Sequence, residues 1–169
     1  MKTPAKVLQQ QVRNESYKSA LTQWFTENRW QKVSSILLGQ DDISLRVLEY
    51  LTDPAFVAEC QRLDIPLSYY IETVDASTGI THRRLFNIHE QLTANQYVRR
   101  KKFMEPFARH NADLPNGGRF AFGYDTQKAV VETNVAQLQF MRFLVENNVI
   151  DWVRRHKDMI LTAKSRSCR

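Results

Sequence analysis

The strongest hydrophobic pattern lies between Thr133 and Ile160. The apolar residues of segment 135–145 cover well over half of a helix circumference, and a helix apolar over so wide an arc is normally buried against more than one neighbour. Asn134 is expected to cap this helix, and Gln137, three residues later, completes the pattern of a capping box. We therefore predict a helix that supplies much of the core.

A second helix is predicted after the polar break at Glu146, Asn147 and Asn148, where Asn148 can act as its cap. Apolar residues then recur at the period of one helix face, at Val149, Trp152, Val153, His156, Met159 and Ile160. The two helices form a helical hairpin. His156 lies on the apolar stripe, so we expect a hydrogen-bonded core histidine there.

The first 66 residues predict four short helices. Thr3-Pro4 is typical of a helix start, but residues 4–13 carry few apolar anchors. Local signals place the first two helices at 15–28 and at 30–37, before Gly39. The third follows the caps Asp41 and Asp42, with Leu45, Leu48 and Leu51 on one face and Val47 beside them. The fourth follows Asp53-Pro54, with Phe56 or Val57, Cys60 and Leu63 buried.

The character of the chain changes at Pro66. Residues 67–74 and 80–88 are rich in aromatic and β-branched residues and flank a turn cluster, which predicts a β-hairpin. Residues 118–124 alternate well enough to be a third strand beside it, and about 90–107 is expected to be helical. The predicted fold class is mainly α (α+β), with a helical N-terminal half, a small antiparallel sheet in the middle third and a C-terminal helix hairpin.

One domain is expected at this length, 169 residues. We divide the chain into an N-terminal arm (1–14), a single helical α+β domain (15–162) and a basic tail (163–169). The arm is expected to be helical when it packs on something, because isolated helices this short are marginal in water.

The formal net charge of +6 is unevenly distributed. Residues 1–66 hold equal numbers of acidic and basic side chains, so the excess lies entirely in the second half. Such asymmetry favours an acidic partner for the C-terminal part.

A run of four basic residues, Arg99 to Lys102, is flanked by Tyr97 and Phe103. Basic residues interleaved with aromatics can neutralise phosphates and stack on bases. A solvated helix face or a contact with an acidic protein would give the same pattern. The predicted contact residues are Arg83, Arg84, Arg99, Arg100, Lys101, Lys102 and Arg119.

The sequence lacks the patterns of several other functions. Its apolar runs are too short to span a bilayer, and residues 1–13 lack the apolar stretch of a secretory signal. Cys60 and Cys168 match no metal or redox spacing, so two reduced and unreactive thiols are expected.

Motifs for catalysis and metal binding are missing as well. The four histidines have no His or Cys three or four residues away. Asn116-Gly117-Gly118-Arg119 lacks the Lys-Ser/Thr pair of a phosphate loop and is expected to be a turn before a strand. We therefore expect neither an enzyme nor a bound metal or cofactor.

Two runs within the C-terminal pattern resemble a theme of small conserved proteins of nucleocytoplasmic large DNA viruses. They are TNVAQLQF at 133–140 and ENNVIDWV at 146–153, with a basic segment upstream. The theme has two aromatics where this chain has Phe140-Met141, and tyrosine where it has Trp152. The resemblance covers about 28 of 169 residues and assigns no active site.

The resemblance implies a virion-associated structural protein. We expect a minor capsid component of a large icosahedral DNA virus, present in the virion and, during assembly, in the host cytoplasm. Its partners would be other structural proteins, with the major capsid protein as a candidate. We expect partner-facing, exposed aromatics at Trp24, Trp30, Tyr69 and Tyr70.

Two other functions fit the sequence. The basic segment allows a nucleic-acid-binding module, and the basic pI of about 9.5 allows an accessory subunit of a large organellar complex.

Overall fold

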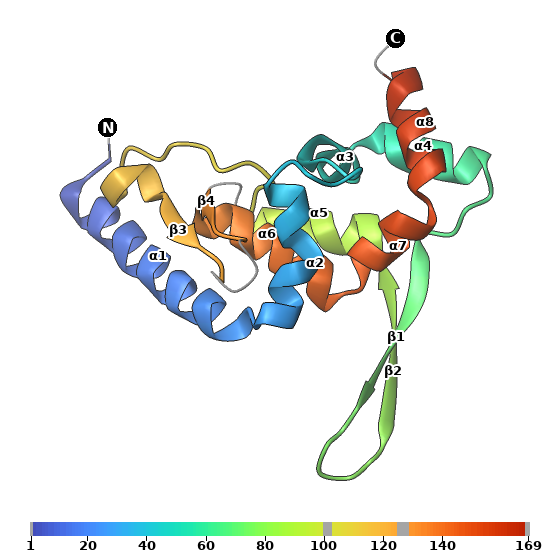
Figure 1. The fold of residues 1–169 in the computed structure, drawn as a ribbon, viewed down its shortest axis with the longest axis horizontal. Helices are drawn as coiled ribbons and strands as arrows, with labels where there is room; N and C mark the ends of the chain where they lie inside the picture. The colour runs from blue at the N-terminus through green and yellow to red at the C-terminus, as the bar shows by residue number, and fades with distance from the viewer. Residues whose placement is uncertain (1, 100–102, 125–128, 168–169) are drawn as a thin grey trace.

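The computed structural model describes residues 2–99, 103–124 and 129–167, which form a helical body with two small antiparallel sheets (Figure 1). The predicted fold class, mainly α (α+β), is confirmed. The elements in chain order are α1 (Pro4–Trp24), α2 (Glu27–Leu37), α3 (Leu45–Tyr50), α4 (Pro54–Arg62), β1 (Ser68–Val74), β2 (Thr81–Asn87), α5 (Ile88–Arg99), the 3₁₀ turn η1 (Pro115–Gly118), β3 (Phe120–Phe122), β4 (Val131–Thr133), α6 (Val135–Glu146), α7 (Val149–Arg155) and α8 (Lys157–Ser167).

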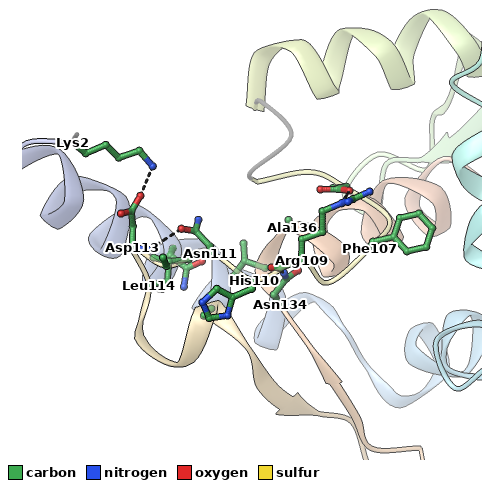
Figure 2. Close-up of a pocket in the computed structure, with 15 residues that line it drawn as sticks. Lys2, Phe107, Arg109, His110, Asn111, Asp113, Leu114, Asn134 and Ala136 are labelled. Carbon is green, nitrogen blue, oxygen red and sulfur yellow. Dashed lines mark hydrogen bonds and ion pairs between the residues drawn. The ribbon is translucent and has the colours of Figure 1, made fainter.

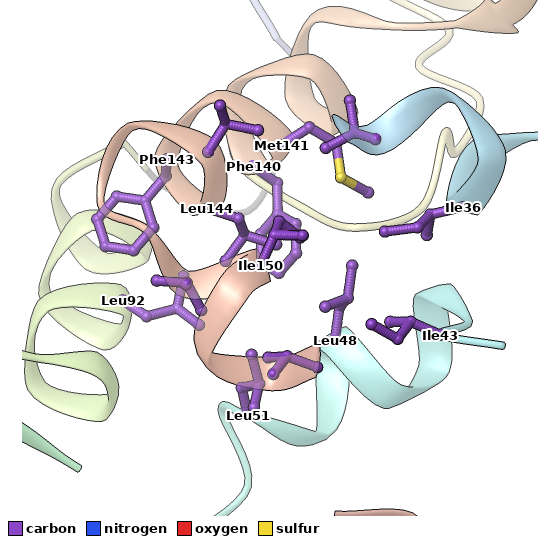
Figure 3. Close-up of a cluster of buried hydrophobic side chains, with 14 of the residues drawn as sticks. Ile36, Ile43, Leu48, Leu51, Leu92, Phe140, Met141, Phe143, Leu144 and Ile150 are labelled. Carbon is purple, nitrogen blue, oxygen red and sulfur yellow. The ribbon is translucent and has the colours of Figure 1, made fainter. Parts of the chain in front are cut away.

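Helix α6 is the centre of the core, and it contacts α1, α2 and α7. Figure 3 shows its apolar side chains meeting those of α2, α3, α5 and α7. Its burial against several neighbours, expected from the wide apolar arc, is confirmed. Asn134 caps the helix by accepting a hydrogen bond from the Gln137 amide at 2.9 Å. The Gln137 side chain instead donates to the Pro106 carbonyl at 3.0 Å, so the reciprocal half of the capping box is replaced by a contact with the preceding loop.

The second predicted C-terminal helix is divided at His156, where the backbone leaves helical geometry (φ −112°, ψ 18°). The single continuous helix was therefore wrong. The His156 ring stacks on Trp152, with 4.3 Å between ring centroids, and its Nδ1 lies 2.9 Å from the Trp152 carbonyl oxygen. The break directs α8 onto α3 and α4. Helix α8 continues to Ser167, and Ala163 within it is buried.

The expected cap of α3 was also wrong. Ser44 caps this helix by accepting from the Val47 amide at 3.3 Å. Asp41 and Asp42 lie before it and pair with Arg154 and Lys157 instead. The cap at Asp53 is confirmed, since its carboxylate accepts from the Ala55 amide at 2.9 Å.

Burial on α4 agrees with the prediction in part. Phe56 and Cys60 are buried, but Leu63 is 40% exposed. Leu63 is the C-cap residue and the chain turns just beyond it, at Asp64, which adopts a left-handed conformation (φ 56°). The apolar stripe therefore loses contact with the core at its last member.

Helix α1 is continuous through residue 14, and the Thr3-Pro4 start is confirmed because the Thr3 hydroxyl accepts from the Lys6 amide at 3.3 Å. The helix ends at Trp24, and Thr26 caps α2. Gln10 and Asn14 are buried. The division of the chain into arm, domain and tail stays a prediction.

The predicted hairpin is confirmed within one residue at each end: β1 and β2 pair antiparallel, with Tyr70 opposite Leu85. Helix α5 begins immediately after β2 and ends at Arg99. The prediction of a helix up to about 107 was wrong for residues 103–107, which are not helical.

The sequence predicted that β3 joins the hairpin, and this prediction was wrong. Strand β3 pairs with β4 in a separate sheet. The physical reason is an aromatic cluster at the α1–α2 corner. Phe122 packs against Phe25 and Trp30 at centroid distances of 5.7 and 4.9 Å. Trp30, which we expected to be exposed, is fully buried there, and its Nε1 donates to the Ala129 carbonyl at 2.6 Å.

Candidate interaction surfaces

The β1–β2 hairpin extends away from the helical body (Figure 1). Its distal half, residues 72–74 and 81–84, is exposed along both strands. The turn between the strands is stabilised locally, because Asp75 accepts hydrogen bonds from the amide and hydroxyl of Ser77 at 2.9 and 2.6 Å. These bonds hold the pKa of Asp75 below its ordinary value. The tip is therefore an ordered turn.

The inner face of the hairpin anchors it to the body. Phe86 is buried and packs against Phe143 of α6, with 5.9 Å between ring centroids. Arg84 donates from Nη2 to the Asn147 side-chain oxygen at 2.7 Å, and the Tyr69 hydroxyl donates to the Asn147 carbonyl. Burial raises the pKa of Tyr69 above its ordinary value, so this hydroxyl stays a donor at neutral pH.

The outer face carries an exposed apolar pair. Tyr70 and Leu85 are direct cross-strand partners and are 55% and 62% exposed. Arg83 lies on the same face, with its guanidinium 4.0 Å from the Tyr70 ring centroid and 3.6 Å from the Glu72 carboxylate. Val74, on the same face by the strand alternation, extends the exposed apolar surface towards the tip. We call Tyr70, Val74 and Leu85 the hairpin patch.

The predicted contact residues do not form one surface in the described part of the chain. Arg83 and Arg84 are neighbours on β2 but point to opposite faces of the hairpin, as the strand alternation requires. Arg119 directly precedes β3, which belongs to the other sheet, and donates to the Ala108 carbonyl at 3.1 Å. Arg99 ends α5, and Arg100, Lys101 and Lys102 lie outside the described residues. Of the two flanking aromatics, Tyr97 is 87% exposed and Phe103 is buried.

A basic cleft beside α1 was missed by the sequence reasoning. It has a volume of about 570 Å³ and is lined by Lys2, Lys6, Gln9, Gln10, Arg13, Val98 and Phe103. The sequence did hold a signal for it, because residues 2–13 contain three basic side chains and no acidic one. We call this site the α1 cleft.

A second cleft, of about 410 Å³, lies between η1 and the start of α6 (Figure 2). Its charged side chains are paired: Lys2 with Asp113, and Arg109 with Glu105. The His110 ring packs closely on Gly117, where an added Cβ would lie 2.2 Å from Nδ1. These contacts fix the loop, so we assign the second cleft no binding role.

A third cleft, of about 720 Å³, includes Cys60 and His89. Burial, together with the nearby charge of Glu59, raises the pKa of the Cys60 thiol to about 11. The thiol is therefore protonated at neutral pH and is a poor nucleophile. His89 Nδ1 lies 3.2 Å from the Leu51 carbonyl oxygen, which fixes the ring as part of the packing.

Among the described residues, no group of three or more His, Cys, Asp or Glu side chains is placed to hold a metal ion. No described helix combines the length and apolar character needed to cross a membrane.

Comparison with known proteins identifies a family and nothing closer. No curated protein matches the chain, and neither does any solved structure. A family model matches residues 10–167, which span the core, the hairpin and part of the α1 cleft. The chain therefore belongs to DUF7197, a family of unknown function.

Proposed function

We propose that this protein is a structural component of a large assembly, a minor capsid protein of an icosahedral DNA virus that acts through protein–protein contacts. The observation that carries the proposal is the hairpin patch, an exposed apolar surface on an arm that projects from the body. The resemblance of the α6–α7 region to virion-associated proteins supplies the identity of the assembly.

The energetics of the hairpin support a protein partner. A two-stranded ribbon is marginally stable without further packing, and the distal half of this one has exposed side chains on both faces. Both of its outer edges also carry backbone groups that another strand could pair with. A neighbouring subunit that covers the patch would bury Tyr70 and Leu85 and stabilise the ribbon at once.

The charge of the hairpin supports the same kind of partner. Residues 68–87 contain two arginines, one glutamate and one aspartate, so the arm carries no net charge when its histidine is neutral. A neutral arm with apolar side chains suits a protein surface better than a phosphate backbone. Tyrosine and arginine side by side, as Tyr70 and Arg83 are here, are typical of protein interface hot spots.

The proposal is tested with the double variant Tyr70→Ser/Leu85→Ser. The variant is co-expressed with the major capsid protein of the same genome, and its amount in purified particles is measured. Loss of two central anchors should reduce incorporation at least about tenfold, since one hot spot alone is worth about 2 kcal/mol or more. The thermal midpoint of the isolated protein should change little, because both side chains are exposed in the free chain.

The matched control is Leu8→Ser/Val12→Ser on α1, where two apolar side chains are 60% and 63% exposed. This pair should leave incorporation unchanged. Equal losses for both double variants would show that general surface polarity matters and the hairpin does not. A wild-type protein that stays a soluble monomer and is absent from purified particles would exclude the proposed function.

A further inference from the structure

The α1 cleft presents an extended row of positive charge. Lys6 and Arg13 differ by seven positions, a spacing that returns to one face of α1, and Lys2, just before the helix, also lines the cleft. Lys6 and Arg13 are separated by about 10 Å along the helix axis at 1.5 Å per residue. Within the described residues, neither of these two side chains makes an ion pair. Such a row suits an extended polyanion better than a single small anion.

The α1 side of the cleft carries charge of one sign. Residues 2–13 contain three Lys or Arg and no Asp or Glu. The acidic side chain nearest to this row is Asp113, which pairs with Lys2 at one end of the cleft. Charge of one sign around a cleft raises the local concentration of an oppositely charged ligand.

Gln10 gives an independent sign of a missing ligand. Its side chain lines the α1 cleft and the residue is only 5% exposed. Its oxygen accepts from Lys2 Nζ at 3.5 Å, whereas its amide nitrogen has no hydrogen-bond partner within the part of the chain that the structure describes. Buried donors are almost always satisfied. A small rotation about the soft terminal torsion would turn this donor towards an oxygen bound in the cleft.

An exposed aromatic residue directly precedes a lining residue of the cleft. Val98 lines the cleft, and Tyr97, the residue before it in α5, is 87% exposed. Base stacking on an exposed ring beside a basic groove is the usual way in which single strands are held without sequence preference. Bases in a duplex are already stacked on one another, so they could not use this ring.

We propose that the α1 cleft binds single-stranded nucleic acid, with phosphates contacting Lys6, Arg13 and the Gln10 amide and one base stacking on Tyr97. This site is separate from the hairpin patch and goes beyond the assembly role. An acidic peptide would satisfy the cations but leave the Tyr97 ring unused, which favours nucleic acid over a protein partner.

The test measures the affinity of the isolated full-length protein for a fluorescein-labelled oligo-dT by fluorescence anisotropy, at several salt concentrations. Lys6→Gln/Arg13→Gln removes two phosphate contacts. The slope of log affinity against log salt should fall in magnitude by about 1.4, at about 0.7 per contact for single strands. The matched control Lys32→Gln/Lys164→Gln removes the same net charge outside the lining of the cleft and should leave the slope unchanged.

Two further variants separate stacking and hydrogen bonding from charge. Tyr97→Ala should weaken binding at least about fivefold, whereas Tyr97→Phe, which keeps a stacking surface, should bind like the wild type. Gln10→Met removes the unpaired donor and keeps the volume. It should weaken binding while leaving the free protein at least as stable, because a buried unsatisfied group is lost.

Several results would overturn the proposal. These are no binding of oligo-dT at about 50 mM salt, an equal change of slope in the control double variant, or a Tyr97→Ala variant with unchanged affinity. Tighter binding of poly-glutamate than of oligo-dT would assign the cleft to an acidic protein. Because the assay uses the isolated protein, its outcome is independent of incorporation into particles.

Discussion

The Arg154 guanidinium donates two hydrogen bonds to the Asp41 carboxylate, from Nη1 to Oδ1 at 3.1 Å and from Nη2 to Oδ2 at 2.8 Å. The pair joins the α2–α3 loop to α7 across 113 positions of sequence. The Ser35 hydroxyl and the Ile43 amide also donate to this carboxylate, at 2.7 and 3.0 Å. The bond from Arg154, opposed by burial and assisted by the other two donors, holds the pKa of Asp41 well below its ordinary value of 3.8.

Asp41→Asn should therefore destabilise the fold in a pH-dependent way. At pH 7 we expect a loss of about 1.5–3 kcal/mol, the range for hydrogen bonds to a charged group. The pKa of Asp41 is lowered in the folded state, so its contribution to the free energy of unfolding is complete above the ordinary value of 3.8. This contribution is lost as the pH falls from there towards the lower folded value. Urea titrations of the wild type and of Asp41→Asn at pH 7 and pH 2–3 measure this pH dependence.

Asp42→Asn is the control, because the Asp42 carboxylate is 76% exposed although it pairs with Lys157 at 2.8 Å. Exposed ion pairs contribute about 0–1 kcal/mol. A stability difference between the wild type and Asp41→Asn that is the same at both pH values would contradict the role of the Asp41 charge.

Trp152→Ala should cost about 3–5 kcal/mol, because truncating a buried tryptophan leaves a large cavity. Trp152 is 3% exposed and packs between the His156 ring and Phe56, whose centroid lies 6.0 Å away. Denaturant titration is the measurement, with Tyr70→Ala as the exposed aromatic control. A loss below about 1 kcal/mol would mean that the Trp152 stripe is not part of the core.

Arg83→Ala and Arg84→Ala should differ although the residues are adjacent. Arg84 bonds the Asn147 side chain, so its loss should cost about 1 kcal/mol and speed amide exchange in β1 and β2. Arg83 makes an exposed ion pair with Glu72, and its loss should change stability by less than about 0.5 kcal/mol. Hydrogen exchange read out by mass spectrometry distinguishes them; equal effects would refute the assignment of separate faces.

Cys60 should be unreactive in the folded protein. With a pKa raised to about 11, its thiolate is scarce at pH 8, and the side chain is also 1% exposed. In a Cys168→Ser variant, alkylation by iodoacetamide at pH 8 should be negligible and should appear on unfolding in guanidinium. Rapid alkylation of the native protein would show that the α4 region opens readily.

Features set by neighbouring residues were predictable from the sequence. The caps at Thr3, Asp53 and Asn134 depend on contacts two or three positions away, and the burial of α6 follows from its own apolar arc. The hairpin was equally predictable, because its turn and its strands are adjacent in the chain.

Features set by distant residues were not predictable. Aspartate is a common helix cap, but Asp41 forms an ion pair with Arg154, which is far away in the sequence. Strand β3 was assigned to the wrong sheet because its pairing depends on how Phe122 packs against Trp30. The α1 cleft forms only when Lys6 and Val98, which are far apart in the sequence, come together in the fold. The basic side chains of the cleft did not stand out in the sequence, because acidic residues elsewhere in 1–66 balance the total charge.

The anchor of the hairpin has a mechanical consequence. Tyr69 and Arg84 both bond to Asn147, the residue that ends the central helix α6. A load applied to the tip of the arm is therefore delivered to the C-terminal end of the core helix and to the turn before α7. A subunit that seats on the arm should stiffen this turn and slow the exchange of its amides, although the turn lies outside the contact. Docking of a subunit on the hairpin would then change the dynamics at the end of the central helix α6.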